Sequence, residues 1–268
     1  MRFVPLMKDA SGSEHTEIEY DPIYDPFNPA LIADPYPFYA RLRDEHPIYF
    51  NERMGFYALS RYDDIFHALR KPQIFSSARG LTPAEDEISQ LGIPPTFIMM
   101  DPPAHPRLRR LLTKAVPPDT VNELEPRIRQ FVVEHVEAMK QKAADGEAVD
   151  LIEGIASPLP TMVVANILGV PPEDREHFDP WSDAITSASA DFSLDVQQAI
   201  GAVQGLVTYF GAMCQARRAN PTDDMISKLT QAEVEGDTLS DWDILGFCFV
   251  MIAGGNDTTT NLIGNSMK

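Results

Sequence analysis

The segment from Ser240 to Lys268 constrains the fold more than any other part of the 268-residue sequence. It opens with a capping-box pattern, Ser240 followed by Asp243, which is typical of a helix start. It then runs apolar through Ile252, and no helix stop signal follows before Lys268. A helix of this length measures roughly 42 Å at ~1.5 Å per residue, and so long an apolar helix needs partners on several sides. We therefore expect this chain to be a portion of a larger helical protein, ending within a central helix.

The remaining pattern predicts a mainly α chain with a small β-sheet near the N-terminus. Residues 1–20 predict a flexible acidic tail, and residues 21–268 are expected to belong to one domain, which opens with a proline-rich extended entry at residues 21–37. Two short strands are predicted over residues 48–50 and 56–59. Between Pro and Gly breaks, helices are predicted over Tyr36–Glu45, Tyr62–Leu69, Ala104–Val116, Val121–Ala144, Ser157–Leu168, Pro172–Ser187, Leu194–Ala219 and Thr222–Gln231.

Composition and charge exclude several classes of protein. The chain carries 22 Lys and Arg against 40 Asp and Glu, a net charge of −18, which repels nucleic acid and anionic membranes. Hydrophobic residues make up 44%, as in a globular protein. Two cysteines exclude a disulfide-stapled scaffold. The start lacks a secretory signal, and the longest apolar run is shorter than the about 20 residues of a membrane span, so we expect a soluble, cytoplasmic protein.

An unusual cluster lies within the last predicted helix, from Ala253 to Thr260. Two adjacent glycines cost on the order of 1 kcal/mol each inside a helix, three threonines crowd the backbone, and Asp257 puts a charge where the flanking pattern predicts core. Such violations are expected at functional sites. The glycines would let a flat ligand lie against the backbone, and an acid beside an alcohol can relay protons. Helix–helix packing of small residues, with Asp257 exposed, explains the cluster equally well.

A second cluster follows Met100, where an Asp and two prolines predict a helix entry. At 100° per residue, His105 and Arg109 share one helix face with Leu108 and Leu112. Two cationic donors one turn apart suit the paired carboxylates of a ligand. An ordinary ion pair with an acidic neighbour is the simpler interpretation of these two residues taken alone. The opposite face is basic, either as a solvated surface or as a docking patch for an acidic partner, and consists of Arg107, Arg110 and Lys114.

Together these segments resemble the cytochrome P450 family of haem-thiolate monooxygenases, in its soluble bacterial form. Residues 34–43 resemble the family's first helix, and residues 56–65 its first hairpin and second helix. Residues 101–110 resemble the segment that carries haem-propionate donors. The run Gly-Gly-Asn-Asp-Thr-Thr at residues 254–259 resembles the oxygen-activation motif of the long central helix. The resemblance extends over nearly the whole chain from Asp25 and implies a truncated cytochrome P450 fold.

The resemblance also implies an activity and roles for individual residues. The reaction is insertion of one oxygen atom of O2 into an apolar substrate, with haem b as cofactor and the other oxygen atom leaving as water. Asp257 and Thr258 would deliver protons during oxygen activation, and His105 and Arg109 would bind the haem propionates. The residues that would face the substrate are Val250, Ala253, Gly254, Ile98 and Met99.

A redox partner is implied as well. In bacterial members of the family, electrons usually arrive through a ferredoxin. The basic stripe of Arg107, Arg110 and Lys114 would suit the docking of such an acidic protein. The resemblance therefore favours a docking function for this face of the predicted helix.

Two features of the family are missing from the sequence. The family holds iron through a cysteine thiolate in a glycine-rich loop near its C-terminus. Cys214 and Cys248 lack that context, and both are predicted to be buried packing thiols. The Glu-x-x-Arg helix of the family is also absent. We therefore expect no metal ligand in this chain, a thiolate ligand C-terminal to Lys268, and no activity from the chain alone.

A second hypothesis is a naturally truncated, catalytically dead helical protein that binds an apolar ligand or a protein partner. An in-frame coding sequence beyond Lys268 that contains the two missing features would favour the monooxygenase, and a stop codon would favour the second hypothesis. A helical hydrolase is a more distant alternative, because the sequence contains neither a Gly-x-Ser-x-Gly elbow nor a His-Glu-x-x-His pair. The sequence does not reveal the identity of the substrate.

Overall fold

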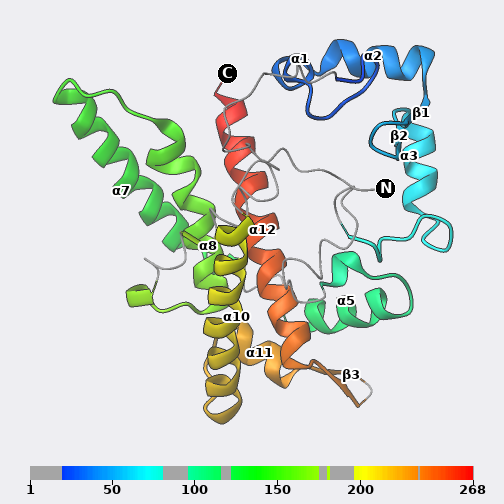
Figure 1. Ribbon diagram of the computed structural model, residues 1–268. Coiled ribbons are helices and arrows are strands. Elements are labelled where there is room, and N and C mark those ends of the chain that lie inside the picture. Colours follow the sequence, from blue (N-terminus) through cyan, green and yellow to red (C-terminus); the bar gives the residue numbers. More distant parts are fainter. Residues whose placement is uncertain are drawn as a thin grey trace, which may run out of the picture. The chain divides into compact units, whose positions relative to one another are not determined.

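The computed structural model describes residues 20–80, 96–115, 122–174, 180–181, 196–234 and 236–267 (Figure 1). All of the predicted acidic tail except Tyr20 lies outside these residues. Contacts divide the chain into two compact units, Met1–Glu87 and Ile88–Lys268. Each unit is described by itself, and the single domain expected over residues 21–268 stays a prediction.

The first unit consists of short helices around one antiparallel hairpin. The predicted helices over Tyr36–Glu45 and Tyr62–Leu69 are confirmed with the same bounds, and the predicted hairpin is confirmed with one added residue. In chain order the elements are α1 (Pro29–Ala33), α2 (Tyr36–Glu45), β1 (Ile48–Asn51), β2 (Phe56–Leu59) and α3 (Tyr62–Leu69).

Helix α1 corrects the extended entry that the prolines predicted. The side chain of Asn28 accepts a hydrogen bond from the backbone N–H of Ala30 at 2.9 Å, which caps the helix. Pro29 occupies the first helical turn, where its missing N–H costs nothing and its fixed φ suits a helix. The same residue type that holds a chain extended therefore begins a helix when a capping side chain precedes it.

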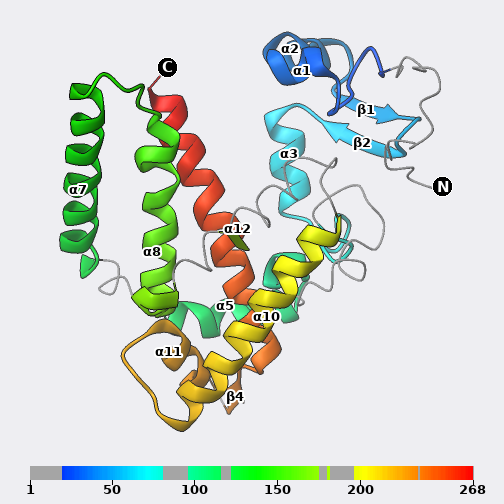
Figure 2. The ribbon, with the colours of Figure 1, turned by 60° about the vertical axis from the view of Figure 1, so that its left-hand side comes forward.

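The second unit is almost entirely helical (Figures 1 and 2). Its longer elements are α5 (Ala104–Ala115), α7 (Glu125–Ala144), α8 (Pro158–Leu168), α10 (Val196–Ala219), α11 (Met225–Gln231) and α12 (Asp241–Ser266). Its shorter elements are η1 (Phe97–Met99), η2 (Ile152–Ala156), η3 (Pro172–Asp174), and the two-residue strands β3 (Glu233–Val234) and β4 (Asp237–Thr238).

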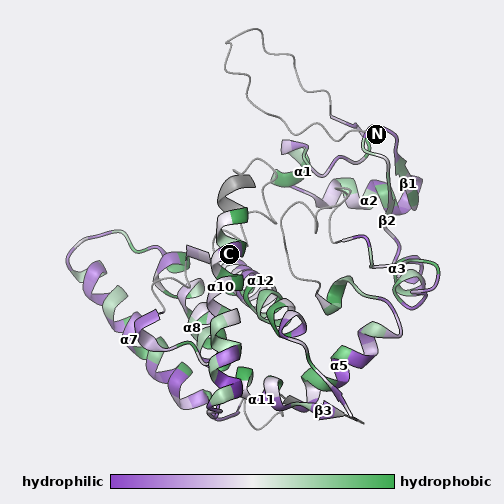
Figure 3. Cartoon of the chain, turned by 60° about the horizontal axis from the view of Figure 1, so that its bottom comes forward, coloured by the Kyte–Doolittle hydropathy of each residue, from purple (hydrophilic) through white to green (hydrophobic). Residues whose placement is uncertain are grey.

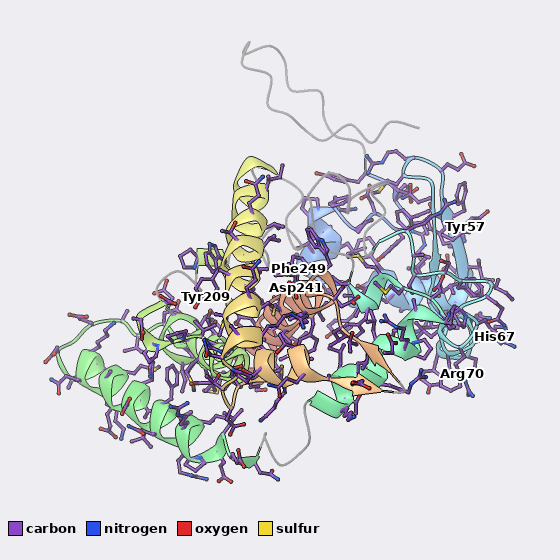
Figure 4. All side chains as sticks on the ribbon, turned by 90° about the horizontal axis from the view of Figure 1, so that it is seen from below. Tyr57, His67, Arg70, Tyr209, Asp241 and Phe249 are labelled. Carbon is purple, nitrogen blue, oxygen red and sulfur yellow. The ribbon has the colours of Figure 1, made fainter. Side chains whose placement is uncertain are left out.

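Helix α12 forms the centre of this unit, as the sequence predicts. It packs against α8, α10, α11 and η2, and apolar residues follow one another along it in Figure 3. The capping box of Ser240 and Asp243 is present in full. Residues 244–249 are buried, including Phe249, which is labelled in Figure 4. Among the described residues, neither α12 nor any other helix is long and apolar enough to cross a membrane.

The two cysteines lie in the core that surrounds α12. Cys214 on α10 and Cys248 on α12 are both free and fully buried, as predicted for packing thiols. Burial raises the pKa of Cys214 to about 11 and raises that of Cys248 well above its usual value. Neither sulfur is therefore a thiolate near neutral pH.

Helix starts differ from the predictions where a cap or a proline decides them. Helix α7 begins at Glu125, with Pro126 in its first turn, and the predicted start at Val121 lies outside the described residues. Of the helix predicted over Pro172–Ser187, the described residues show η3 and two helical residues at 180–181, and the others lie outside the described residues. The π-helix η2 and the β3–β4 hairpin are not predicted, because neither carries enough residues to produce a period.

Asp224 fixes the start of α11 with a network of hydrogen bonds. Its carboxylate accepts from the backbone N–H of Ser227 at 2.7 Å, from the hydroxyl of Thr222 at 2.7 Å, and from the guanidinium of Arg217. Burial alone would raise the pKa of Asp224, but these donors outweigh it and the pKa is lowered. The charged carboxylate is therefore the form that stabilises the fold.

We predict that Asp224→Asn lowers the free energy of unfolding by about 1–3 kcal/mol at neutral pH, because it removes charge-assisted hydrogen bonds. A depressed carboxyl pKa contributes stability above the unfolded value near 3.8, and this contribution is lost as the pH falls through the lower folded value. The difference between wild type and variant should therefore disappear in acid. Urea unfolding of both proteins at neutral and acidic pH measures this difference in the free energy of unfolding.

The neighbouring Asp223 provides the control. Its side chain is 89% exposed and pairs with Lys228 at 2.9 Å. Surface pairs contribute little, so Asp223→Asn should leave the stability nearly unchanged at both pH values. Equal losses for the two variants would contradict a special role for Asp224.

Candidate functional site

The C-terminal half of α12 presents an exposed face to one side. The exposed positions recur at helical spacing and are Gly254, Asp257, Thr258, Asn261, Leu262, Asn265 and Ser266. Residues three and four apart lie one above the other on a helix, so these positions form a continuous stripe. A Cβ added at Gly254 would have no described atom within 4 Å. The stripe therefore offers an open helix surface at its glycine.

The opposite face of the same half-helix is closely packed. A Cβ at Gly255 would lie 2.8 Å from Cγ2 of Val164 on α8. The hydroxyl of Thr260 donates to the backbone oxygen of Ala156 at 3.1 Å. The adjacent glycines therefore have different roles: Gly255 permits close helix packing, and Gly254 leaves backbone open. The packing interpretation of the glycine pair is thus confirmed at Gly255, and the approach of a flat ligand at Gly254 stays a prediction.

Asp257 and Thr258 lie next to each other on the exposed stripe. The Oδ1 atom of Asp257 accepts a hydrogen bond from Nδ2 of Asn261 at 2.8 Å. The hydroxyl of Thr258 donates to the carbonyl oxygen of Gly254 at 2.7 Å, one turn earlier in the same helix. The core position expected for Asp257 from the flanking pattern is wrong, because the side chain is exposed. An acid and an alcohol are thus both accessible on one helix face.

The second cluster lies on α5, where Leu108 and Leu112 are buried. His105 is half-buried and Arg109 is exposed. Within the described part of the chain, no hydrogen bond or ion pair engages the imidazole of His105 or the guanidinium of Arg109. Both side chains are therefore available as donors to a ligand, and the ordinary ion pair that the sequence also allowed is not formed among these residues.

Phe97 connects α5 with α12, which the sequence did not indicate. Its ring stacks on the imidazole of His105, with centroids 6.2 Å apart, and on the ring of Phe247 in α12, with centroids 6.5 Å apart. The short helix η1 thereby contacts both longer helices. An aromatic residue shortly before the prolines at 102 and 103 is the only sequence signal of this contact.

Among the residues predicted to face a substrate, burial varies. Met99 is buried and Ile98 is half-buried, both in η1. Val250 and Ala253 are partly buried and pack against the core on α12, whereas Gly254 is exposed. The structure thus brings η1 and α12 together through Phe97, and it places these predicted residues on those two elements.

The basic stripe of α5 is largely engaged within the chain. Arg107 donates to both carboxylate oxygens of Asp237 in β4, with an Nη2–Oδ1 distance of 2.6 Å. The hydrogen bond from Arg107 lowers the pKa of Asp237. Lys114 donates from Nζ to the backbone oxygen of Glu233 in β3 at 2.5 Å. Of the three cations, Arg110 is the one exposed side chain for which the described residues show no hydrogen bond or ion pair.

No metal centre is found among the described residues, where no three His, Cys, Asp or Glu side chains gather. The anionic ligand predicted at His105 and Arg109 stays a prediction. Imidazole and guanidinium groups bind carboxylates, and the glycine face of α12 permits close approach of a flat group.

Comparison with known proteins identifies the class. The sequence profile of the family described as Cytochrome P450 matches residues 38–266. Cytochrome P450 130 of Mycobacterium tuberculosis is 40% identical over 243 residues, which cover 87% of this chain and 59% of that relative. Erythromycin C-12 hydroxylase of Saccharopolyspora erythraea is 34% identical over 236 residues, covering 85% of this chain and 55% of that enzyme.

Solved structures agree with the sequence matches. Cytochrome P450 CYP109Q5 from Chondromyces apiculatus superposes with a TM-score of 0.76 at 34% identity, covering 89% of this chain and 58% of that chain. The chain therefore belongs to the cytochrome P450 family, and its expected fold class is confirmed. It spans about three fifths of the length of the relatives that it matches.

The two glycines of α12 provide a matched pair of variants. Gly255→Ala should lower the free energy of unfolding by about 1–3 kcal/mol, because its Cβ would overlap Val164, whose β-branched side chain cannot rotate away. Gly254→Ala should raise it by about 0.5–1 kcal/mol, because alanine favours the helix and the position is open. Chemical denaturation of the two variants measures both values.

A second substitution tests the cause of the loss. Val164→Ala in the Gly255→Ala background removes the overlapping methyl groups, so the double variant should recover part of the stability lost in Gly255→Ala. Equal stability of the two single glycine variants would show that the two faces of α12 do not differ as described.

Proposed function

We propose that the protein is a haem-dependent monooxygenase and that this chain provides the oxygen side of its haem pocket. The observation that carries the proposal is the exposed stripe of Gly254, Asp257 and Thr258 on α12 of a cytochrome P450 family member. The reaction is the insertion of one oxygen atom of O2 into an apolar substrate. A cytoplasmic location is part of the same proposal.

The residues present fit haem b. His105 and Arg109 are hydrogen-bond donors without partners among the described residues, and two propionate carboxylates require such donors. Gly254 leaves the helix backbone open where a porphyrin plane would lie. When bound, haem supplies the binding and reduction of O2. The chain's own residues then orient the group through its carboxylates and exclude bulk water along the apolar part of α12.

Asp257 and Thr258 serve as the proton pathway. The carboxylate of Asp257 is exposed and can take a proton from solvent. The hydroxyl of Thr258 can donate its proton toward the pocket and then receive one from Asp257. Thr258 currently donates to Gly254 at 2.7 Å, and rotation about χ1 would release that hydrogen bond. This acid–alcohol arrangement is a general acid–base device.

An apolar substrate is consistent with the residues expected beside it, Ile98, Met99, Val250 and Ala253. CYP109E1 from Bacillus megaterium, which is 33% identical with a TM-score of 0.72, was solved in complex with testosterone. P450BioI, at 27% identity and a TM-score of 0.76, was solved in complex with an acyl carrier protein ligated to hexadec-9Z-enoic acid. Both relatives support an apolar substrate class for this chain.

A ferredoxin-type electron donor completes the proposal, docking near Arg107, Arg110 and Lys114. Two of these cations are bound to the β3–β4 hairpin, so Arg110 is the residue that would contribute most to docking. The net charge of −18 makes a local cationic face more selective, because the remaining surface repels an acidic partner.

We predict that the chain binds ferric haem and that His105→Ala and Arg109→Ala each weaken binding about tenfold, the effect of losing about 1.4 kcal/mol of charge-assisted hydrogen bonding. A Soret titration measures the affinity. Arg129→Ala on α7 is the control, since Arg129 pairs only with exposed Glu125 at 2.9 Å among the described residues, and it should leave the affinity unchanged.

The same complex should lack the thiolate-type Soret shift when it is reduced and exposed to carbon monoxide. Both cysteines are buried and their pKa values are raised, so neither supplies a thiolate to iron. A clear thiolate-type shift would refute this assignment of Cys214 and Cys248. Unchanged haem affinity in both α5 variants would refute the propionate role.

The proton pathway is tested in the protein expressed from its own gene, with testosterone as probe substrate. Asp257→Asn and Thr258→Val should each lower the product formed per O2 consumed by about 10²-fold, the lower end of what general acid–base catalysis contributes. Substrate affinity should not change. Thr259→Val is the control, because the Thr259 hydroxyl donates to Gly255 at 3.1 Å on the packed side, and normal turnover of both test variants would contradict the pathway.

A further inference from the structure

Three consecutive threonines in α12 use their hydroxyl groups in two different ways. The hydroxyls of Thr258 and Thr259 each donate to the backbone oxygen four residues earlier in their own helix, at 2.7 and 3.1 Å. The hydroxyl of Thr260 instead donates at 3.1 Å to the backbone oxygen of Ala156 in η2, 104 positions earlier in the chain. Thr260 therefore joins two elements, whereas its neighbours bond only their own helix.

The acceptor of this hydrogen bond lacks its usual helical partner. Ala156 is fully buried, and in an α-helix its carbonyl would accept the N–H of the residue four positions further on. That residue is Pro160, which has no N–H. A buried carbonyl without a hydrogen bond is unfavourable. The hydroxyl of Thr260 thus donates to Ala156 in place of the N–H that Pro160 lacks.

The element that carries Ala156 has an uncommon geometry. In η2 the N–H of Ser157 donates at 3.0 Å to the backbone oxygen of Ile152, five residues earlier, which is the π-helical pattern. Single π-helical turns are rare and often lie at functional sites. The side chain of Ile152 also approaches α12, because a Cβ added at Gly264 would lie 2.7 Å from its Cδ1 atom.

Thr260 and Gly264 are four residues apart, so they form one line of contact along α12. The two contacts differ in what they fix. Apolar contact at Gly264 limits how closely η2 and α12 approach, whereas a hydrogen bond has a direction. The bond from Thr260 therefore also defines how far α12 is rotated about its own axis relative to η2.

This rotation decides where the proposed proton pathway points. At 100° per residue, Asp257 lies about 60° around the helix axis from Thr260, and Gly255, which packs against α8, lies about 140° from it. Two contacts on different sides of α12 thus hold the half-turn that carries Asp257 and Thr258. Loss of the contact at Thr260 leaves the packing at Gly255 as the remaining constraint of the two.

We propose that Thr260 is a positioning residue, whose hydrogen bond to Ala156 holds α12 at the rotation that directs Asp257 and Thr258 toward the pocket. This inference rests on the proposed function. Thr260 acts through those two side chains, and it contacts neither the substrate nor the haem. A small misplacement is sufficient to matter, because an error of about 1 Å in a reacting geometry can cost about 10²-fold in rate.

The test uses Thr260→Val, which keeps the branched shape and removes the hydroxyl, and Thr260→Ser, which keeps the hydroxyl. Both are made in the protein expressed from its own gene, with testosterone as probe substrate. We expect Thr260→Val to lower the product formed per O2 consumed about tenfold and to leave substrate affinity within about twofold of wild type. Thr260→Ser should stay within about twofold of wild type in both measurements.

A variant of similar stability separates positioning from simple destabilisation. Ile226 in α11 is fully buried, and Ile226→Val removes one methyl group from the core without removing a hydrogen bond. Ile226→Val and Thr260→Val should each lower the melting temperature by about 2–4 °C. Only Thr260→Val should lower the product formed per O2. An equal loss of product in both variants, or normal product in Thr260→Val, overturns the inference.

Amide hydrogen exchange of the substrate-free protein provides a readout that does not depend on turnover. Thr260→Val should raise exchange about tenfold over residues 152–157 and 256–264, because the bond between η2 and α12 no longer opposes local opening. Ile226→Val should leave exchange over these two segments within about twofold of wild type. Unchanged exchange over both segments in Thr260→Val overturns the inference.

Failure of this inference can be distinguished from failure of the proposed function. If Asp257→Asn and Thr258→Val lose product while Thr260→Val does not, the role of Thr260 fails and the proton pathway stands. If Asp257→Asn and Thr258→Val keep normal turnover, the proton pathway fails. A loss of product confined to Thr260→Val would then show that Thr260 serves another step, which overturns the inference as stated.

Discussion

The packing of Gly255 against Val164 is the contact on which the arrangement of α12 depends. Since a Cβ at this position would lie 2.8 Å from the valine, α8 approaches α12 more closely than any side chain at residue 255 would permit. That contact fixes the rotation of α12 about its own axis. At 100° per residue, Gly254 and Asp257 then lie about 100° and about 160° around the helix axis from Gly255, and Thr258 lies about 60° away; all three are exposed. The position of the chemical groups is thus a consequence of a packing constraint one residue away.

Phe97 extends this constraint to a second helix. Its ring lies against both His105 and Phe247, so the cationic donors of α5 are held relative to the buried half of α12. The three-residue helix η1 thereby connects two long helices. One aromatic side chain, Phe97, therefore connects α12, which carries Asp257 and Thr258, with α5, which carries His105 and Arg109.

Much of this architecture could be predicted from the sequence, for reasons that differ between elements. Helices α2 and α3 and the capping box of α12 were predicted well, because periodicity and caps are local properties. The cluster on α12 was found because it violates local propensity, and the cluster on α5 was found because helical spacing puts His105 and Arg109 on one face. The β3–β4 hairpin was not predicted, since two-residue strands have no period, and its ion pair with Arg107 joins residues 130 positions apart.

This missed ion pair changes how the charge of the chain should be understood. In the sequence, Arg107, Arg110 and Lys114 form a basic stripe on an acidic protein, and nothing in the pattern distinguishes one of the three as a contact for a partner. In the fold, Asp237 neutralises Arg107 and a backbone carbonyl holds Lys114. These two cations anchor the hairpin against α5, and the cost of releasing them opposes any partner that would compete. Among the described residues, the α5 donor side chains without a hydrogen bond or ion pair are therefore Arg110 on one face and His105 and Arg109 on the other, and the proposed contacts with a partner and with haem depend on these three.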